Sequence, residues 1–124
     1  MSDRSSIDPR PSDGAAVGPL DIAMLAEMEA LLGRQRLLVL LADFRGEIVR
    51  LLLPDGLPPD VLARNVHALT SASGMLGFTA LSHACASIEE GCRGQADADG
   101  LRRSARNAGQ SALDALAGVT ARLA

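Results

Sequence analysis

Apolar residues recur every three to four positions along most of this chain, which is the period of an α-helix. The pattern predicts five helices. The first begins at Pro19 or Leu20 and ends at Leu32, and the others cover residues 34–53, 59–76, 79–92 and 101–123. No segment shows the two-residue alternation of a half-buried strand. The sequence therefore predicts an all-α fold, an antiparallel up-down four-helix bundle with an additional short N-terminal helix.

Residue types at the ends of these segments support the predicted boundaries. Gly33 and Gly77 suit the residue after a helix, where a left-handed backbone is common. Pro59 suits the first turn of a helix, where its missing N–H costs little. Thr79 is expected to cap the fourth helix through its hydroxyl. Residues 94–100 are rich in Gly and Asp, and we expect them to form a polar loop.

The apolar faces of the five helices define a candidate core. Its expected members are Ile22, Leu25, Met28 and Leu32; Leu37, Leu40, Leu41, Phe44, Ile48, Leu51 and Leu52; Leu62, Val66, Leu69, Ser73 and Leu76; Leu81, Ala84, Cys85 and Ile88; and Leu101, Ala105, Ala108, Ala112, Leu116, Val119 and Leu123.

Length and charge limit the possible classes of protein. Residues 1–18 lack apolar periodicity and are expected to be a flexible leader, so that residues 19–124 form one helical domain. A net charge of −3 argues against a nucleic-acid partner, which requires a basic face. No apolar run reaches the roughly 18 residues that a membrane-spanning helix needs, so we expect no membrane partner. No secretory signal is visible at the N-terminus, and we expect a cytoplasmic protein.

The two cysteines are seven residues apart on one predicted helix. Two helical turns separate Cys85 from Cys92 by roughly 10 Å, which exceeds the reach of a disulfide, so both are expected to be free thiols. Neither the cysteines nor His67 and His83 show metal-ligand spacing, and no metal site is expected.

His67 is the residue most suited to chemistry. It lies at the edge of the apolar face of the third predicted helix, and Ser71, Gly74 and Phe78 follow it at helical spacing. Because the residues next along this face are small, a large partner could approach the imidazole. An ordinary surface histidine on a bundle helix is the alternative interpretation.

Three neighbours of His67 could donate hydrogen bonds to a phosphate. Arg64 lies one turn before it, and Thr70 and Ser71 lie one turn after it. A guanidinium and two hydroxyl groups are suitable donors to phosphate oxygens. They could equally be ordinary solvated side chains.

The residues around His67 resemble the signature of histidine-phosphotransfer (HPt) domains, and the similarity covers residues 20–124. The family motif reads His-x-Leu-Lys-Gly-Ser/Ala-Ala-x-x-Leu-Gly, followed by a Leu, a small or Cys residue and a closing Leu/Ile-Glu. The matching residues are His67, Leu69, Ala72, Leu76, Gly77, Leu81, Cys85, Ile88 and Glu89. Thr70 and Ser71 stand where the family usually has Lys and Gly, so this chain lacks the family's cation beside the histidine.

The resemblance implies a phosphoryl carrier without kinase activity of its own. His67 would accept a phosphoryl group from an aspartate of a receiver domain and pass it to another receiver. Glu89 would orient the ring, Arg64, Thr70 and Ser71 would contact phosphate or orient the ring, and Gly74 and Phe78 would lie where the partner docks. An apolar patch from the second and third helices would complete the docking face.

The resemblance also implies the partners. They would be a response-regulator receiver domain and a hybrid sensor histidine kinase. The receiver would supply Mg²⁺, so the chain would need no cofactor of its own. We expect the chain to be a monomer.

Two alternatives stay open. The missing Lys would suit an HPt-like scaffold or inhibitor that binds a receiver or histidine kinase without accepting phosphate. The alanine-rich apolar face of residues 101–123 would suit a helical oligomerisation domain.

Overall fold

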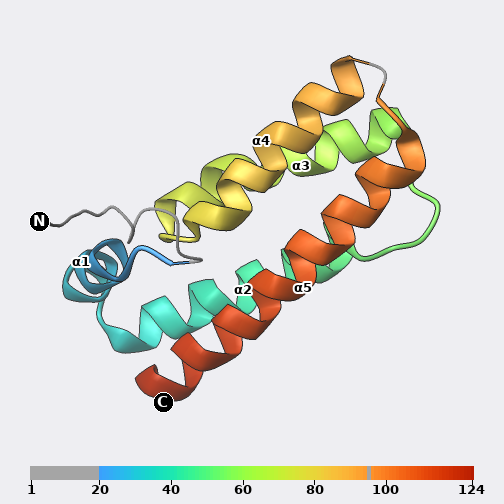
Figure 1. The fold of residues 1–124 in the computed structure, drawn as a ribbon. Coiled ribbons are helices and arrows are strands. Elements are labelled where there is room, and N and C mark those ends of the chain that lie inside the picture. The colour runs from blue at the N-terminus through green and yellow to red at the C-terminus, as the bar shows by residue number, and fades with distance from the viewer. Residues whose placement is uncertain (1–19, 95) are drawn as a thin grey trace, which may run out of the picture.

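The structure is a computed structural model that describes residues 20–94 and 96–124, and all regular secondary structure in these residues is α-helical (Figure 1). The five helices are α1 (Ile22–Leu32), α2 (Arg34–Leu52), α3 (Pro59–Met75), α4 (Thr79–Arg93) and α5 (Ala98–Leu123). The prediction of an all-α fold is confirmed. The predicted leader, residues 1–18, lies outside the described residues.

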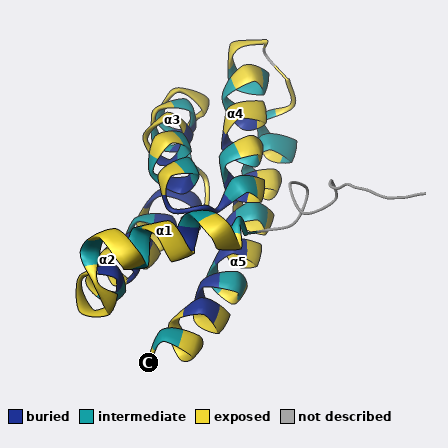
Figure 2. Ribbon diagram, turned by 90° about the vertical axis from the view of Figure 1, so that its left-hand side faces the viewer, coloured by how far each residue is buried: buried dark blue, intermediate teal, exposed yellow. Residues whose placement is uncertain are grey.

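The four longer helices surround one core. α3 packs along α4, α4 along α5, α5 along α2, and α2 along α3, while α1 packs mainly on α2 (Figure 1). Each helix buries the side that faces its neighbours and exposes the other side (Figure 2). α1 is mostly exposed and buries only Leu25.

Most of the predicted core is buried. Its buried members are Leu25, Leu37, Leu41, Phe44, Ile48, Leu51, Leu52, Leu62, Val66, Leu69, Ser73, Leu76, Leu81, Cys85, Ile88, Ala105, Ala112, Leu116 and Val119, and Phe78 is buried with them. Met28, Leu101, Ala108 and Leu123 pack against this cluster while partly exposed. Leu32 and Ala84 are also only half-buried.

Two predicted core residues are exposed, and those predictions are wrong. Leu40 lies about 60° around α2 from Leu37 and about 100° from Leu41, which puts it on the rim of the buried face. Ile22 is exposed because it is the first residue of α1, at the edge of the core. Both residues have the helical spacing of core positions but lie outside the buried face.

The close approach of α2 and α5 depends on a glycine that the apolar pattern does not mark. Gly109 is buried, and a Cβ there would lie 3.2 Å from both Leu52 Cβ and Leu53 Cδ2. A Cβ at this position would therefore require Leu52 and Leu53 to shift by a few tenths of an ångström.

Capping corrects three predicted boundaries. α1 begins at Ile22 because the Asp21 carboxylate accepts a hydrogen bond from Met24 N at 3.1 Å. Phe78, not Thr79, is the N-cap residue of α4, and Thr79 is already helical. α5 begins at Ala98, one turn earlier than predicted, since Asp97 accepts a hydrogen bond from Gly100 N at 3.0 Å. The predicted loop at residues 94–100 is shortened accordingly, and its residue 95 lies outside the described residues.

The turn between α3 and α4 holds the two helices together at one end. Gly77 has a φ of 83°, in the left-handed region, as predicted for a residue that ends a helix. Its carbonyl accepts a hydrogen bond from Asp21 N at 2.6 Å, so the start of α1 is bound to this turn. A Cβ on Gly77 would lie 2.7 Å from Asp21 O. The turn therefore excludes any side chain at this position.

Both cysteines are free thiols, as predicted. Cys85 is fully buried in α4, and burial raises the pKa of its thiol to about 11. Cys92 is half-buried, and desolvation together with the charge of Glu89 raises its pKa as well. Among the described residues, no helix has the length and apolar character needed to cross a bilayer.

We predict that Gly77→Ala lowers the free energy of unfolding by about 2 kcal/mol or more, because it adds left-handed strain to a backbone clash. Urea denaturation measures the change. Gly46→Ala is the matched control, since a Cβ there meets nothing within 4 Å in the middle of α2. The control should keep or gain stability, by up to about 1 kcal/mol. Equal stability of the Gly77→Ala variant and the wild type would contradict this account of the turn.

Stability should fall as pH rises above 9 toward 11. Unfolded thiols ionise near 9, whereas the folded Cys85 thiol stays protonated up to about 11, so alkaline pH favours the unfolded chain. The chain has no Lys and no Tyr, which leaves the thiols as the side chains that titrate in this range. Urea denaturation at several pH values measures the effect. A Cys85→Ala variant should show a flatter profile, and an unchanged profile in that variant would contradict the assignment.

Candidate functional site

His67 stands on the outer side of α3. Its neighbour Val66 is fully buried, but the His67 side chain is 76% exposed. The histidine therefore lies next to the buried side of α3, on the exposed side, and its ring is accessible to a large molecule.

Glu89 of α4 holds one side of this ring. The distance from His67 Nδ1 to Glu89 Oε2 is 3.0 Å, and the Glu89 side chain is only 22% exposed. An ionised carboxylate can only accept hydrogen bonds, so the ring must carry its proton on Nδ1 to make this contact. In the neutral ring, Nε2 then keeps its lone pair. No residue in the described parts of the chain forms a hydrogen bond with Nε2.

Packing between α3 and α4 brings these two side chains together. Ser82 Oγ donates a hydrogen bond to Thr70 O at 3.1 Å, which joins the helices one turn beyond His67. Gly74 lies beside Ser82, and a Cβ there would be in ordinary van der Waals contact with Ser82 Oγ at 3.6 Å, so the spacing of the helices does not depend on this glycine. The packing of α3 on α4 places His67 and Glu89 within hydrogen-bond distance.

Arg93 is a member of the site that the apolar pattern does not single out. Its Nη1 lies 3.4 Å from Glu89 Oε2, and its Nη2 lies 3.4 Å from Glu90 Oε1. The signal in the sequence is the spacing of Glu89 and Arg93, because oppositely charged residues four apart on a helix are neighbours. The same spacing is common on solvated helix faces, so the charge pair indicates a functional site only together with the contact between Glu89 and His67.

The three candidate phosphate donors differ in their surroundings. Thr70 Oγ1 donates to Val66 O at 2.9 Å, so its hydroxyl hydrogen is used within α3 and no free donor is placed there. Arg64 and Ser71 are exposed, and their side chains form no hydrogen bond with any other residue that the structure describes. Their contact with a phosphate stays a prediction.

Phe78 cannot contribute its side chain to a docking surface, and that prediction is wrong. It is 1% exposed, and its ring packs against Phe44 with centroids 5.0 Å apart. The reason is that α3 ends at Met75 and the chain turns at Gly77, so Phe78 does not continue the face that carries His67. The absent Cβ of Gly74 faces Ser82 of α4, and a partner's approach to this backbone stays a prediction.

Exposed apolar residues lie on both helices that were expected to form a docking patch. Met75 at the end of α3 is 63% exposed, and Val39 and Leu40 are exposed on α2. Val39 and Leu40 line a shallow groove together with Leu32 of α1.

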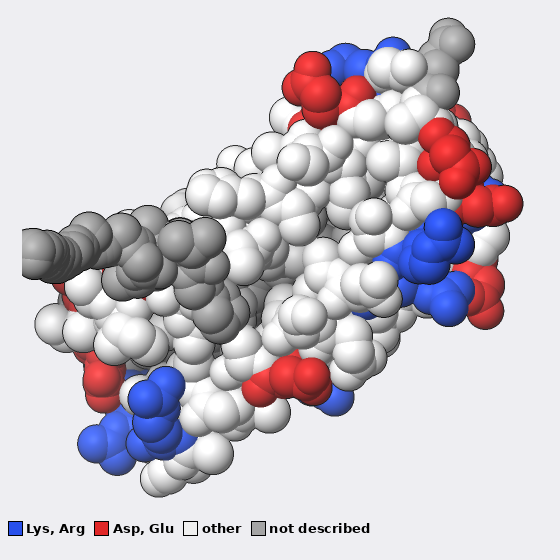
Figure 3. Space-filling view, viewed as in Figure 1, with Lys and Arg blue, Asp and Glu red and all other residues white. Residues whose placement is uncertain are grey.

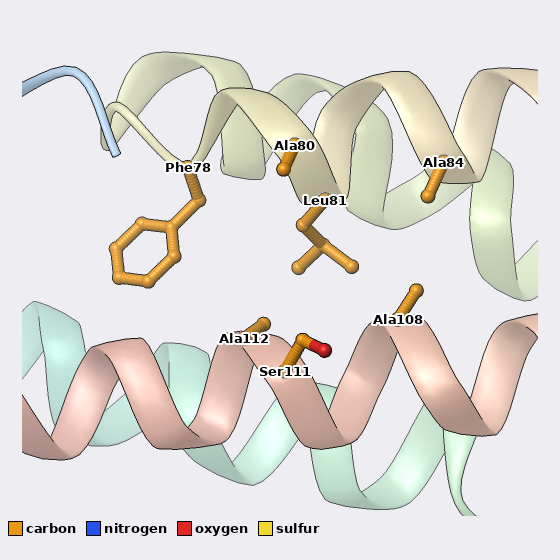
Figure 4. A pocket seen from close by; sticks show the side chains of 7 residues that line it. All are labelled: Phe78, Ala80, Leu81, Ala84, Ala108, Ser111 and Ala112. Atoms are coloured by element: carbon orange, nitrogen blue, oxygen red, sulfur yellow. The ribbon is translucent and has the colours of Figure 1, made fainter. Parts of the chain in front are cut away.

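Other surfaces of the molecule offer less chemistry. The face seen in Figure 3 has charged side chains toward its two ends and one charged cluster at its lower edge, with uncharged surface between them. Figure 4 shows a cavity between α4 and α5, lined by Phe78, Ala80, Leu81, Ala84, Ala108, Ser111 and Ala112. The Ser111 hydroxyl is the one polar side-chain group among these seven, so the lining is largely apolar. Among the described residues, no three His, Cys, Asp or Glu side chains gather as metal ligands would.

The apolar face of α5 does not support the oligomerisation alternative. Ala105, Ala112, Leu116 and Val119 are buried within the single chain. Most of this face is therefore used within the chain, and Leu101, Ala108 and Leu123 of the same face are only partly buried.

The site of the described residues is an exposed imidazole with one ring nitrogen held by a carboxylate, on a helical scaffold, and such a ring is suited to act as a nucleophile. Residues 22–123 match the family model of the Hpt domain, and the chain belongs to that family. Membership indicates histidine phosphotransfer in two-component signalling, through contact with receiver domains and kinases. Neither a search of curated proteins nor one of solved structures gives a match.

We predict that Phe78→Ala lowers the free energy of unfolding by about 3 to 5 kcal/mol, because it leaves a cavity in the core beside Phe44. Met75→Ala is the control, and removal of that exposed side chain should change stability by about 0.5 kcal/mol or less. Thermal or urea unfolding of both variants measures the difference. Similar stability of the two variants would contradict the placement of Phe78 in the core.

Proposed function

We propose that His67 accepts a phosphoryl group from the aspartate of a receiver domain and passes it to a second receiver, in a multistep two-component phosphorelay. The observation that supports this most strongly is the exposed ring whose Nδ1 bonds to Glu89 at 3.0 Å. That bond leaves Nε2 as the unprotonated nucleophile on the solvent side.

The transfer needs no proton acceptor beside Nε2, because this nitrogen carries no proton when it attacks. The Nε2 lone pair attacks phosphorus, and the Nε2–P bond forms as the bond from phosphorus to the aspartate oxygen breaks. The bonding electrons leave with the aspartate carboxylate. His67 keeps the proton on Nδ1, and the positive charge that develops on the ring faces the carboxylate of Glu89.

The receiver supplies what this site lacks. Mg²⁺ and most of the charge stabilisation are assigned to the receiver, and the chain is proposed to need no cofactor of its own. Arg64 is the cation nearest to His67 on its own helix, one turn away, and it is our candidate to contact phosphate in place of the family's Lys. Ser71 is the second candidate.

The docking surface is the outer side of α3 together with α2. His67 and Ser71 would lie under the receiver, and Met75, Val39 and Leu40 would provide apolar contact. Donor and acceptor are proposed to be a hybrid sensor histidine kinase and a response regulator, both acting on a monomer in the cytoplasm.

The architecture proposed for this function is an antiparallel up-down four-helix bundle of α2 to α5, with α1 as the additional helix. The closed set of packing contacts among these four helices supports it, as do the short connections between consecutive helices.

A second candidate function is an HPt-like scaffold or inhibitor that binds a receiver or kinase without accepting phosphate. The observation that favours it is Thr70, which replaces the family's Lys and uses its hydroxyl hydrogen on Val66 O. Without a cation at this position, docking could persist while transfer is lost.

Incubation with a panel of phosphorylated receiver domains tests the proposal. We expect radiolabelled phosphate to move to the wild-type chain and to be absent from His67→Gln, since glutamine has no nucleophilic ring nitrogen. His83→Gln is the control, because it removes the chain's other histidine, which is exposed on α4, and it should keep the label.

Label that persists on His67→Gln would rule out His67 as the acceptor. Binding to a receiver without any transfer, unchanged by His67→Gln, would favour the scaffold over the relay.

A further inference from the structure

Arg93 has no part in the proposed transfer, yet it touches the carboxylate that holds His67. Glu89 Oε2 lies 3.0 Å from His67 Nδ1 and 3.4 Å from Arg93 Nη1. One carboxylate oxygen therefore accepts a hydrogen bond from the ring on α3 and another from the guanidinium on its own helix.

The second arm of the guanidinium is also occupied. Arg93 Nη2 lies 3.4 Å from Glu90 Oε1, so the two terminal amino groups bind two adjacent carboxylates. Arg93 is the last residue of α4, where a cation is favoured by the helix dipole. The contacts to Glu89 and Glu90 span one helical turn, the spacing at which such pairs form without strain.

The orientation of Glu89 is what makes this arrangement matter. A glutamate side chain rotates among several staggered rotamers, and only some of them bring Oε2 to His67. The guanidinium binds the same oxygen, and so it favours the rotamers in which the carboxylate reaches the ring. Glu90 limits the freedom of Arg93 in turn.

We propose that Arg93 is a positioning residue for the phosphoacceptor. It fixes Glu89 in the rotamer that accepts the Nδ1 proton of His67, and it thereby keeps the lone pair on Nε2. The inference rests on the proposed role of His67, but the state of the ring can be measured whether or not the chain accepts phosphate.

The expected effect is modest. Arg93 is 64% exposed, and exposed ion pairs change an equilibrium by about two- to fivefold. Arg93→Gln removes the charge and the guanidinium fork but keeps good helix propensity, so α4 should stay folded. Arg103→Gln on α5 makes the same change of charge at an exposed position away from His67 and is the matched control.

Long-range ¹H–¹⁵N correlation spectra of the neutral His67 ring provide the first test. In Arg93→Gln the ratio of the Nδ1–H to the Nε2–H tautomer should fall by about two- to fivefold, as expected for one exposed ion pair. In Arg103→Gln it should not change. An unchanged ratio in Arg93→Gln would overturn the proposal.

A double-mutant cycle on phosphorylation provides the second test, with phosphoramidate as a small-molecule donor. Arg93→Gln should slow labelling of His67 by about two- to fivefold in the wild-type background. It should have no effect in a Glu89→Ala background, because the carboxylate through which Arg93 acts is gone. Equal slowing in both backgrounds would overturn a role through Glu89.

The two tests separate this inference from the proposed function. If the wild-type chain takes no phosphate on His67, the proposed function fails, and the tautomer ratio alone decides whether Arg93 positions Glu89.

Discussion

The hydrogen bond between His67 Nδ1 and Glu89 Oε2 is the interaction on which the site depends. It crosses from α3 to α4 and joins an exposed ring to a carboxylate that is largely shielded from solvent. The bond selects the tautomer of the ring, fixes its orientation and leaves Nε2 open. A histidine with the same exposure but without this partner would populate both tautomers and rotate freely, and it would offer less of the nucleophile in a defined position.

The rest of the fold serves this contact by fixing the distance between the two helices. The left-handed turn at Gly77 connects them at one end, and the Ser82–Thr70 hydrogen bond joins them one turn beyond His67. The core beneath is built from apolar residues at helical spacing, which keeps Val66 inside and therefore His67 outside. A domain that carries a group on a histidine needs a packed core that fixes the helix and an exposed ring, since its partner must reach the ring and find it in one orientation.

The helices and most of the core were predictable because the spacing of the apolar residues indicates which side of each helix is buried. The prediction fails where the period alone cannot say where a neighbour ends: Leu40 and Ile22 lie on the rim, and α5 starts one turn early because Asp97 caps it. Phe78 was misplaced because the helical face of α3 was extended through Gly77, beyond the point where the chain turns. Glu89 came from the family resemblance, since no periodicity relates residues on two helices. Arg93 was visible as a charge pair with Glu89, but only the structure shows that the same carboxylate also binds His67.

The central claim is that Glu89 occupies Nδ1 and leaves Nε2 to carry the phosphoryl group. The most direct measurement is the ³¹P–¹⁵N coupling pattern of the phosphorylated, ¹⁵N-labelled protein, which identifies the ring nitrogen bonded to phosphorus. The account predicts phosphorus on Nε2 of His67, with the proton still on Nδ1. Phosphorus on Nδ1 would contradict it, because that nitrogen could no longer donate to the carboxylate of Glu89.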